Sequence, residues 1–306
     1  MQVVVRQISG LGNQLFQYAA GRYYAKRFAA SMRLAIDPPR SAHSYGSPRP
    51  FLLSHFCITA PYFELTGEER LILARRRFLQ PAAAAYQRIR RIQVFREEVA
   101  ARYTFPGDPI LRDSVERLYL AGYWQAQEIA SRVAPELREE FRFRAAPSGR
   151  NLEVLDQIQS QGENAVSLHV RRGDYTLAAE GNIALPLAYY DRAIDFFRER
   201  LDKPVFFVFS DDIPFTRQHL PPGIEAVFVD HNGDASSHED MRLMSACRHH
   251  IIANSSFSWW GAWLNPRADK LVFAPKYWHL TAGSYFPGLY PTDWIIGEFE
   301  PRPGTR

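Results

Sequence analysis

Arg171 and Arg172 stand side by side in the segment HVRRGDY, residues 169–175, directly after an apolar run. One of them could pair with the nearby Asp174, but a single carboxylate cannot hold two guanidinium groups in good bidentate geometry. A planar guanidinium fork suits a diphosphate, whose charge is spread over several oxygens. The segment therefore predicts a site for an anionic ligand, with His169 either a buried core histidine or a further ligand contact.

Two other polar clusters also follow apolar runs. Ser255 and Ser256 open a predicted helix, where hydroxyls and free N–H groups can bind phosphate, although a simple N-cap is the alternative. Asp211 and Asp212 could cap the helix that follows them or bind a metal ion through a nucleotide diphosphate. No other carboxylate spacing supports a metal site.

The N-terminal segment SGLGNQLFQYAAGR, residues 9–22, links a predicted strand to a predicted helix. It resembles a dinucleotide-binding fingerprint, but Leu15 occupies the third glycine position, which disfavours an NAD(P) site. A tight turn with a helix start is one interpretation. The other is that the glycines let the main chain approach a ligand that the neighbouring amides bind. The residues concerned are Gly10, Gly12, Asn13 and Gln14.

Alternating apolar runs and helical segments must position these clusters. In the second half, strands are predicted at 164–170, 205–210, 225–229, 250–253 and 271–274. This alternation predicts a mostly parallel sheet with helices on both faces. Ligands bind outside the carboxyl ends of such strands, where the polar clusters fall.

The chain start reads as a second βα pattern. Strands are predicted at 2–8 and 32–37, a helix at 13–28, and another strand at 118–125. We therefore predict an α/β protein with an N-terminal domain over 1–150, a C-terminal nucleotide-binding domain over 151–280, and a tail over 281–306. The segment 144–151, rich in small and turn-forming residues, is the predicted linker.

Composition narrows the class of partner. The 306 residues are 46% hydrophobic and 23% charged, with a net charge of +4, which fits a soluble protein with an anionic small ligand or a membrane surface and does not argue for nucleic acid. Cys57 and Cys247 are predicted to be unpaired thiols in a reducing cytosol. No apolar stretch reaches transmembrane length, so a cytoplasmic location is expected.

The segment 66–101 is predicted to be helical and rich in arginine. It is either a solvated helix face or a patch that contacts anionic lipid or an anionic acceptor. Its arginines are Arg70, Arg75, Arg76, Arg77, Arg88, Arg90, Arg91 and Arg96.

Five segments taken together resemble the bacterial α-1,2-fucosyltransferases of glycosyltransferase family 11. They are GLGNQLFQYAAGR, GYWQ, SLHVRRGDY, FVFSDD and HEDMRLMSACRHHIIANSSFSWWGAWLN, in that order. The match runs from residue 8 to about 278 and is weakest over 38–115. The resemblance implies a GT-B-like fold of two Rossmann-like domains facing a cleft. It also implies GDP-fucose as donor, inversion at the fucose anomeric carbon, and no metal or other cofactor.

The same resemblance implies an acceptor, and it leaves alternative functions open. The acceptor would be the 2-hydroxyl of a terminal galactose in an oligosaccharide, a lipid-linked glycan or an O-antigen, reached in the cytoplasm or at the inner face of the membrane. The N-terminal domain would carry the acceptor side. The alternatives are fucose transfer with another linkage or acceptor, and a non-catalytic nucleotide- or carbohydrate-binding protein on the same fold.

Residue roles follow from the resemblance for the donor. Arg171 would hold the β-phosphate, His169 would lie against the guanine-binding region, and Asp240 would accept from guanine N1–H and the 2-amino group. The remaining predicted donor-binding residues are Arg172, Ser255, Ser256, Gly12 and Gln14.

The predicted catalytic residues are Arg171, Asn13 and Asp174. Asn13 belongs to a loop that would lie near the reacting hydroxyl. Asp174 is the nearest candidate for the general base, with Glu180 behind it.

Overall fold

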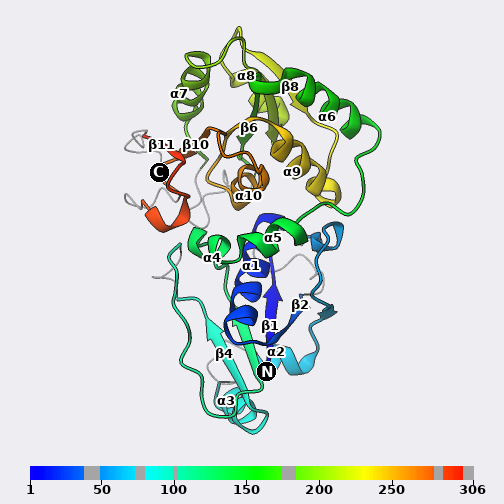
Figure 1. The fold of residues 1–306 in the computed structure, drawn as a ribbon, viewed down its shortest axis with the longest axis vertical. Coiled ribbons are helices and arrows are strands. Elements are labelled where there is room, and N and C mark those ends of the chain that lie inside the picture. Colours follow the sequence, from blue (N-terminus) through cyan, green and yellow to red (C-terminus); the bar gives the residue numbers. More distant parts are fainter. Residues whose placement is uncertain (38–48, 74–79, 99–102, 174–183, 279–284, 299–306) are drawn as a thin grey trace. The chain divides into compact units, whose positions relative to one another are not determined.

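Each half of the chain folds around a parallel β-sheet (Figure 1). The computed structural model describes residues 1–37, 49–73, 80–98, 103–173, 184–278 and 285–298. Unit 1 comprises Met1–Arg144 with Pro287–Leu289, and unit 2 comprises Ala145–Phe286 with Tyr290–Arg306. The division falls after Arg144, at the start of the predicted linker. Each unit is an α/β domain built on a parallel sheet, as the sequence predicts.

Unit 1 contains a five-stranded sheet in the order β3-β2-β1-β5-β4, with every pair parallel. Its strands are β1 (Gln2–Gln7), β2 (Ser31–Ile36), β3 (Tyr62–Glu64), β4 (Ile92–Arg96) and β5 (Arg117–Ala121). Its helices are α1 (Leu11–Arg27), η1 (Leu53–His55), α2 (Gly67–Ile72), α3 (Gln80–Ile89), α4 (Gln127–Arg132), α5 (Ala134–Glu140) and η7 (Pro287–Leu289).

Alternation of side chains along β1 assigns one face to each helix layer. Val5 points toward α1, because a Cβ placed on Gly21 of that helix would collide with the Val5 side chain. Val4 points the other way and packs with Ile72 of α2 and Tyr119 of β5. The central strand is thus buried on both faces, as its run of valines predicts.

Unit 2 contains a six-stranded parallel sheet in the order β11-β10-β9-β6-β7-β8. Its strands are β6 (Ala165–Val170), β7 (Val205–Ser210), β8 (Glu225–Val229), β9 (His249–Ile251), β10 (Val272–Pro275) and β11 (Ile295–Gly297). Its helices are α6 (Arg150–Gln161), η4 (Gly162–Asn164), α7 (Leu187–Arg198), α8 (Ile213–His219), η6 (Asp234–Ser236), α9 (Ser237–Ala246) and α10 (Ser256–Leu264).

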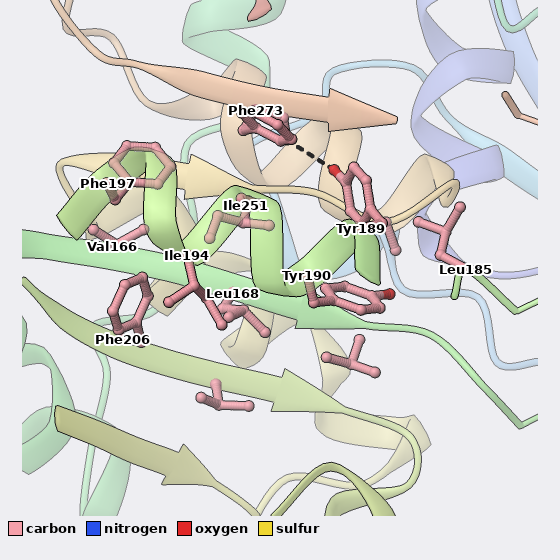
Figure 2. Close-up of a cluster of buried hydrophobic side chains, with 14 residues drawn as sticks. Val166, Leu168, Leu185, Tyr189, Tyr190, Ile194, Phe197, Phe206, Ile251 and Phe273 are labelled. Atoms are coloured by element: carbon pink, nitrogen blue, oxygen red, sulfur yellow. Dashed lines mark hydrogen bonds between the residues drawn. The ribbon is translucent and has the colours of Figure 1, made fainter. Parts of the chain in front are cut away.

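Helices cover both faces of this sheet. On one face α7 packs on β6, β7 and β9, and Figure 2 shows Tyr189 and Ile194 of α7 among the strand side chains. The Tyr189 hydroxyl donates to the carbonyl of Ile252 at 2.7 Å and lies 3.2 Å from that of Phe273. On the other face α6 and α9 pack on Val205 and Phe207 of β7. The sheet is therefore a rigid support for the loops at its edges.

Several predictions about elements are corrected. Residues 92–96 form strand β4, which pairs with β5, although the sequence predicted helix from 66 to 101. Helix α3 ends before Arg91, whose positive φ of 53° turns the chain into the strand. The predicted tail includes β11, which pairs with β10 at the sheet edge. The predicted helix at 128–143 is divided at Val133 into α4 and α5, and Pro135 lies in the first turn of α5.

Two smaller predictions are confirmed. The tryptophans of SWWGAW are core residues, with Trp259 and Trp260 fully buried. Cys57 and Cys247 are both free cysteines.

Gly21→Ala is expected to lower the melting temperature, because the added methyl group would meet Val5 and lie 2.6 Å from Met32 Cε. Overpacking of this kind costs about 1–3 kcal/mol. Gly67→Ala is the matched control, since nothing lies within 4 Å of its added Cβ. Equal melting temperatures for the two variants in scanning calorimetry would show that α1 and β1 are less closely packed than described.

Candidate functional site

The carboxyl ends of β6 and β7 bring two arginines and two aspartates together. Arg171 Nη1 lies 3.0 Å from Asp211 Oδ2, and the main-chain N–H of Arg172 donates to Asp211 Oδ1 at 2.8 Å. Arg172 Nε lies 3.5 Å from Asp212 Oδ2. Each arginine therefore has its own carboxylate on the neighbouring strand. Asp174 and Glu180, the candidate bases, lie outside the described residues.

Gly173 allows this close approach. A Cβ at this position would lie 2.6 Å from Asp211 Oδ2, so a larger residue would displace the carboxylate that holds Arg171. Asp212 also caps α8, accepting from the N–H of Phe215 at 3.1 Å. The prediction that an aspartate here caps the following helix is confirmed. Both carboxylates already have partners within the protein.

An aromatic stack supports Arg172. Its guanidinium carbon lies 3.3 Å from the centroid of the Phe215 ring, which stacks on His219 at 3.8 Å with an interplanar angle of 15°. A cation over an aromatic face is attracted by the ring's quadrupole. This stack holds Arg172 on the α8 side of the strand end.

His169 is buried at the end of β6. Its Nδ1 has no hydrogen-bond partner among the described residues, and its ring lies 5.8 Å from that of Phe257. Burial, and secondly the charge of Arg171, hold the pKa of His169 well below its usual range, so the ring is neutral at physiological pH. An orphaned ring nitrogen is costly in a core unless a ligand or water completes it.

Asp240 on α9 differs from the other acidic side chains around it. Asn232 Nδ2 donates to its Oδ1 at 2.7 Å, and no described residue forms an ion pair with it. Burial raises its pKa to about 7, and the adjacent Glu239 adds to the effect. Glu239 itself is engaged by Arg242 at 2.8 Å. Asp240 is therefore an acceptor available to a ligand that brings its own donors.

A network of amides positions Asn232. Its Nδ2 also donates to Asn151 Oδ1 at 2.8 Å, and His231 Nε2 lies 2.8 Å from the same oxygen. Asn151 lies in α6, although the predicted linker over 144–151 included it. The sequence analysis missed the link from Asn151 through Asn232 to Asp240, because a linker residue is not expected to form such side-chain contacts.

Ser255 acts as the N-cap of α10, as the alternative interpretation had it. Its hydroxyl accepts from the N–H of Phe257 at 3.3 Å, and the residue is buried. Ser256, the first residue of the helix, is half-buried. The start of α10 follows β9, so it also lies at the carboxyl edge of the sheet.

In unit 1, Asn13 and Gln14 build the turn between β1 and α1. Ser9 has a positive φ of 68° and is held by Asn13 Nδ2, which donates to its hydroxyl at 3.0 Å, and by Gln14 Nε2, which donates to its carbonyl at 2.9 Å. Gln14 Nε2 also donates to Pro50 O at 2.8 Å, and its Oε1 accepts from Leu52 N at 3.0 Å.

These bonds change the expected role of Gln14. Both of its amide hydrogens are used by the main chain, so it positions the turn instead of offering donors to a ligand. Gly12 is buried in the first turn of α1, after Gly10 as N-cap. Asn13 Oδ1 accepts from Gln125 Nε2 at 2.5 Å, which joins this turn to the GYWQ segment.

Three further residues at this edge were missed in the sequence. Glu97 accepts from the N–H groups of Tyr123 and Trp124 at 2.7 and 2.8 Å. Gln17 accepts from the N–H of Ile8 and donates to the carbonyl of Gly122, directly after β5. Gln7 is buried, and neither of its amide atoms is hydrogen-bonded to a described residue. Of these three, only Gln7, a polar residue at the end of the first predicted strand, carried a visible signal.

Each unit thus carries its own group of candidate residues. The edge of unit 2 brings together His169, Arg171 and Arg172 with Asp211, and carries Asp240, Ser255 and Ser256 on adjoining elements. The edge of unit 1 carries Gly12, Asn13 and Gln14. Within the described ranges, no group of three His, Cys, Asp or Glu residues could hold a metal ion, and no helix is long and apolar enough to cross a membrane.

Comparison with known proteins gives these parts a context. Residues 113–282 match the family model described as Glycosyl transferase family 11. The chain is 33% identical to an α-1,2-colitosyltransferase of Escherichia coli, over 90% of this chain and 92% of that protein. It is 27% identical to the O-antigen biosynthesis glycosyltransferase WbnK of Escherichia coli, over 94% and 97% respectively.

A mammalian protein matches a smaller part of this chain. The chain is 32% identical to the galactoside 2-α-L-fucosyltransferase Sec1 of Mus musculus, over 43% of this chain and 38% of that protein. The bacterial relatives therefore cover both units, and the mammalian relative covers less than half of the chain.

Asp240→Asn tests the raised pKa. An unfolded aspartate titrates near pH ~3.9, whereas the pKa of Asp240 is about 7 in the folded protein. Between these two pH values Asp240 is protonated in the folded state and ionised in the unfolded state. The free energy of unfolding therefore falls as the pH rises through this range. The melting temperature of Asp240→Asn relative to wild type should therefore rise from about pH 4 to about pH 7 and then level off. A difference independent of pH in scanning calorimetry would contradict this assignment.

Proposed function

The chain belongs to glycosyl transferase family 11, and from this premise we propose that it transfers L-fucose from GDP-fucose to the 2-hydroxyl of a terminal galactose. The transfer inverts the fucose anomeric carbon and makes an α-1,2 linkage. The acceptor is an oligosaccharide or a lipid-linked glycan such as an O-antigen unit, and the enzyme acts in the cytoplasm, at the inner face of the membrane.

The observation that carries the proposal is the placement of Arg171. It lies at the carboxyl edge of unit 2, held by Asp211 at 3.0 Å and half-buried. Ligands of parallel α/β sheets bind at this edge. A guanidinium group presents its N–H donors in a planar fork that matches the oxygens of a phosphate. Arg171 is thus the donor to the β-phosphate, and Arg172, stacked on Phe215, is the supporting charge.

Asp240 supports guanine as the base. An aspartate with one amide donor and no cationic partner among the described residues fits the N1–H and 2-amino donors of guanine. Adenine and uracil lack that pair of adjacent donors, so a carboxylate here selects for guanine. His169 lies near the end of β6, is neutral, and has an Nδ1 atom without a hydrogen-bond partner among the described residues. We assign it to a further contact with the donor.

The reaction follows from these charges. The acceptor oxygen forms a bond to fucose C1 as the bond from C1 to the diphosphate oxygen breaks, and the acceptor proton passes to a base, for which Asp174 is the candidate. Negative charge grows on the departing GDP and is met by Arg171 and by the N–H groups at the start of α10. Asn13 and Gly12 in unit 1 are assigned to the reacting hydroxyl and the diphosphate.

We further propose that no metal ion takes part. A metal-dependent enzyme would need carboxylates aimed at the diphosphate. Asp211 is engaged by Arg171 and by the N–H of Arg172, and Asp212 caps α8. The positive charge that a metal would bring is supplied by the arginines.

Colitose is the second candidate for the donor sugar, because the relative that covers nine-tenths of this chain is a colitosyltransferase. Colitose lacks the 3-hydroxyl of fucose, so the two donors differ by one polar group. A site that binds the 3-hydroxyl would reject the deoxy sugar strongly, whereas an apolar site would discriminate weakly.

A donor and acceptor panel tests the proposal. We expect transfer from GDP-fucose to a galactose-terminated acceptor, no transfer to the matching 2-deoxygalactose acceptor, and full activity in EDTA after removal of metals. A preference for GDP-colitose would identify colitose, and not fucose, as the donor sugar. Transfer to the 2-deoxy acceptor would show that the linkage is not to the 2-hydroxyl. No transfer from any GDP-sugar would identify a non-catalytic protein, and loss in EDTA restored by Mg²⁺ would overturn the metal-free reaction.

Arg171→Ala is expected to lower kcat about 100- to 1,000-fold, as the loss of one preorganised donor to a developing charge usually does. Arg171→Lys should recover little, because an ammonium group lacks the planar fork. Arg198→Ala, at an exposed arginine of α7, is the matched control and should retain full activity. A loss of less than about tenfold at saturating donor would remove Arg171 from the phosphate site.

A further inference from the structure

Unit 1 carries a second basic site, at the amino-terminal edge of its sheet. A pocket of about 450 Å³ lies between α3 and the loop before β5. Its lining includes Gln87, Arg88, Arg91, Ile92, Arg112 and Asp113. The turn that carries Asn13 follows the carboxyl end of β1, so this pocket lies at the opposite edge of the same sheet and is distinct from the site described above.

Specific bonds build this pocket. The side chain of Gln93 in β4 donates to Ile110 O at 2.8 Å and accepts from Arg112 N at 2.9 Å. The Arg112 guanidinium donates to the carbonyl of Ile92, and Arg91 O accepts from Glu116 N at 2.8 Å. These bonds hold the loop at residues 110–112 beside the end of α3.

Two isoleucines project from this place into solvent. Ile89 at the end of α3 is 78% exposed, and Ile110 in the adjoining loop is 94% exposed. Helix α3 buries only Ala83 among its described residues. The exposed Ala82 and Ala85 lie on the same stripe as Ile89 by helical spacing. A short helix with an apolar stripe open to water and arginine beside it is typical of a helix that lies in a membrane interface.

The charges around the isoleucines are predominantly positive. Arg88, Arg91 and Arg112 face two carboxylates, Asp113 and Glu116, of which Glu116 pairs with Arg91 at 2.7 Å. Arg88 is exposed and forms no ion pair with a described residue. The surplus charge surrounds apolar side chains, which is complementary to the headgroups and acyl boundary of an anionic bilayer.

We propose that Arg88, Ile89, Arg91, Ile110 and Arg112, which we call the α3 surface, dock the protein on an anionic lipid bilayer. The isoleucines enter the acyl boundary, and the arginines bind lipid phosphates. Docking would bring the enzyme to a membrane-bound acceptor. The inference does not depend on the transferase activity, because docking can be measured without it.

Vesicle sedimentation tests this proposal. We expect the wild-type protein to sediment with mixed phosphatidylcholine–phosphatidylglycerol vesicles, to remain in solution with pure phosphatidylcholine, and to be released by high salt. The variant Ile89→Asp/Ile110→Asp should bind at least about tenfold more weakly, since it loses both apolar anchors and adds two negative charges. Arg88→Gln should weaken binding to a smaller extent. Activity on a soluble acceptor should stay unchanged in each.

Controls separate docking from general surface effects. Leu152→Asp changes a side chain of similar class that is 44% exposed on α6. Arg142→Gln changes an arginine whose side chain is 67% exposed. Both should bind vesicles as the wild type does. The proposal is overturned if the wild type does not sediment with anionic vesicles, if the isoleucine variant sediments equally well, or if inorganic phosphate binds the pocket while vesicles do not.

Discussion

The ion pair between Arg171 and Asp211 organises the carboxyl edge of the sheet in unit 2. Strands β6 and β7 pair in parallel with His169 opposite Phe209 and Val170 opposite Ser210. The next residues in this register are Arg171 and Asp211, so the sheet itself brings the two charges together at its edge. An ion pair that remains partly accessible contributes little to stability. Its consequence is geometric, since it fixes a guanidinium group where ligands of parallel sheets bind.

Other carboxylates near this edge are used in the same way, and the exception is informative. Asp212 caps a helix, Asp230 lies 3.0 Å from Arg150, and Glu239 pairs with Arg242. Asp240 has an amide donor and no ion pair with a described residue, and burial raises its pKa to about 7. Asp240 is therefore the carboxyl group to which our proposal assigns a ligand with N–H donors.

The sequence predicted structure correctly where a local pattern of residue types has one common physical cause, such as a run of apolar residues in a buried strand. The alternating apolar runs predicted every strand of unit 2 except β11, and they placed the clusters that contain Arg171 and Asp211 at strand ends, where the structure has them. It was misleading where tertiary contacts decided. Residues 92–96 follow an arginine-rich helical segment but pair with β5. The amide of Gln14 is hydrogen-bonded to Pro50 and Leu52, which are distant in the sequence. Such partners have no local signal.

The most direct test of the donor site is a calorimetric titration of the protein with GDP, ADP and UDP across the pH range around the pKa of Asp240. The ratio of GDP to ADP affinity cancels the titration of the phosphates, so it reports the base contact alone. If the ionised carboxylate binds guanine, this ratio should rise up to about tenfold per pH unit below pH ~7 and then level off, and it should be independent of pH in Asp240→Asn. Equal affinity for the three nucleotides, or a ratio unaffected by pH in the wild type, would contradict the assignment of Asp240 to guanine.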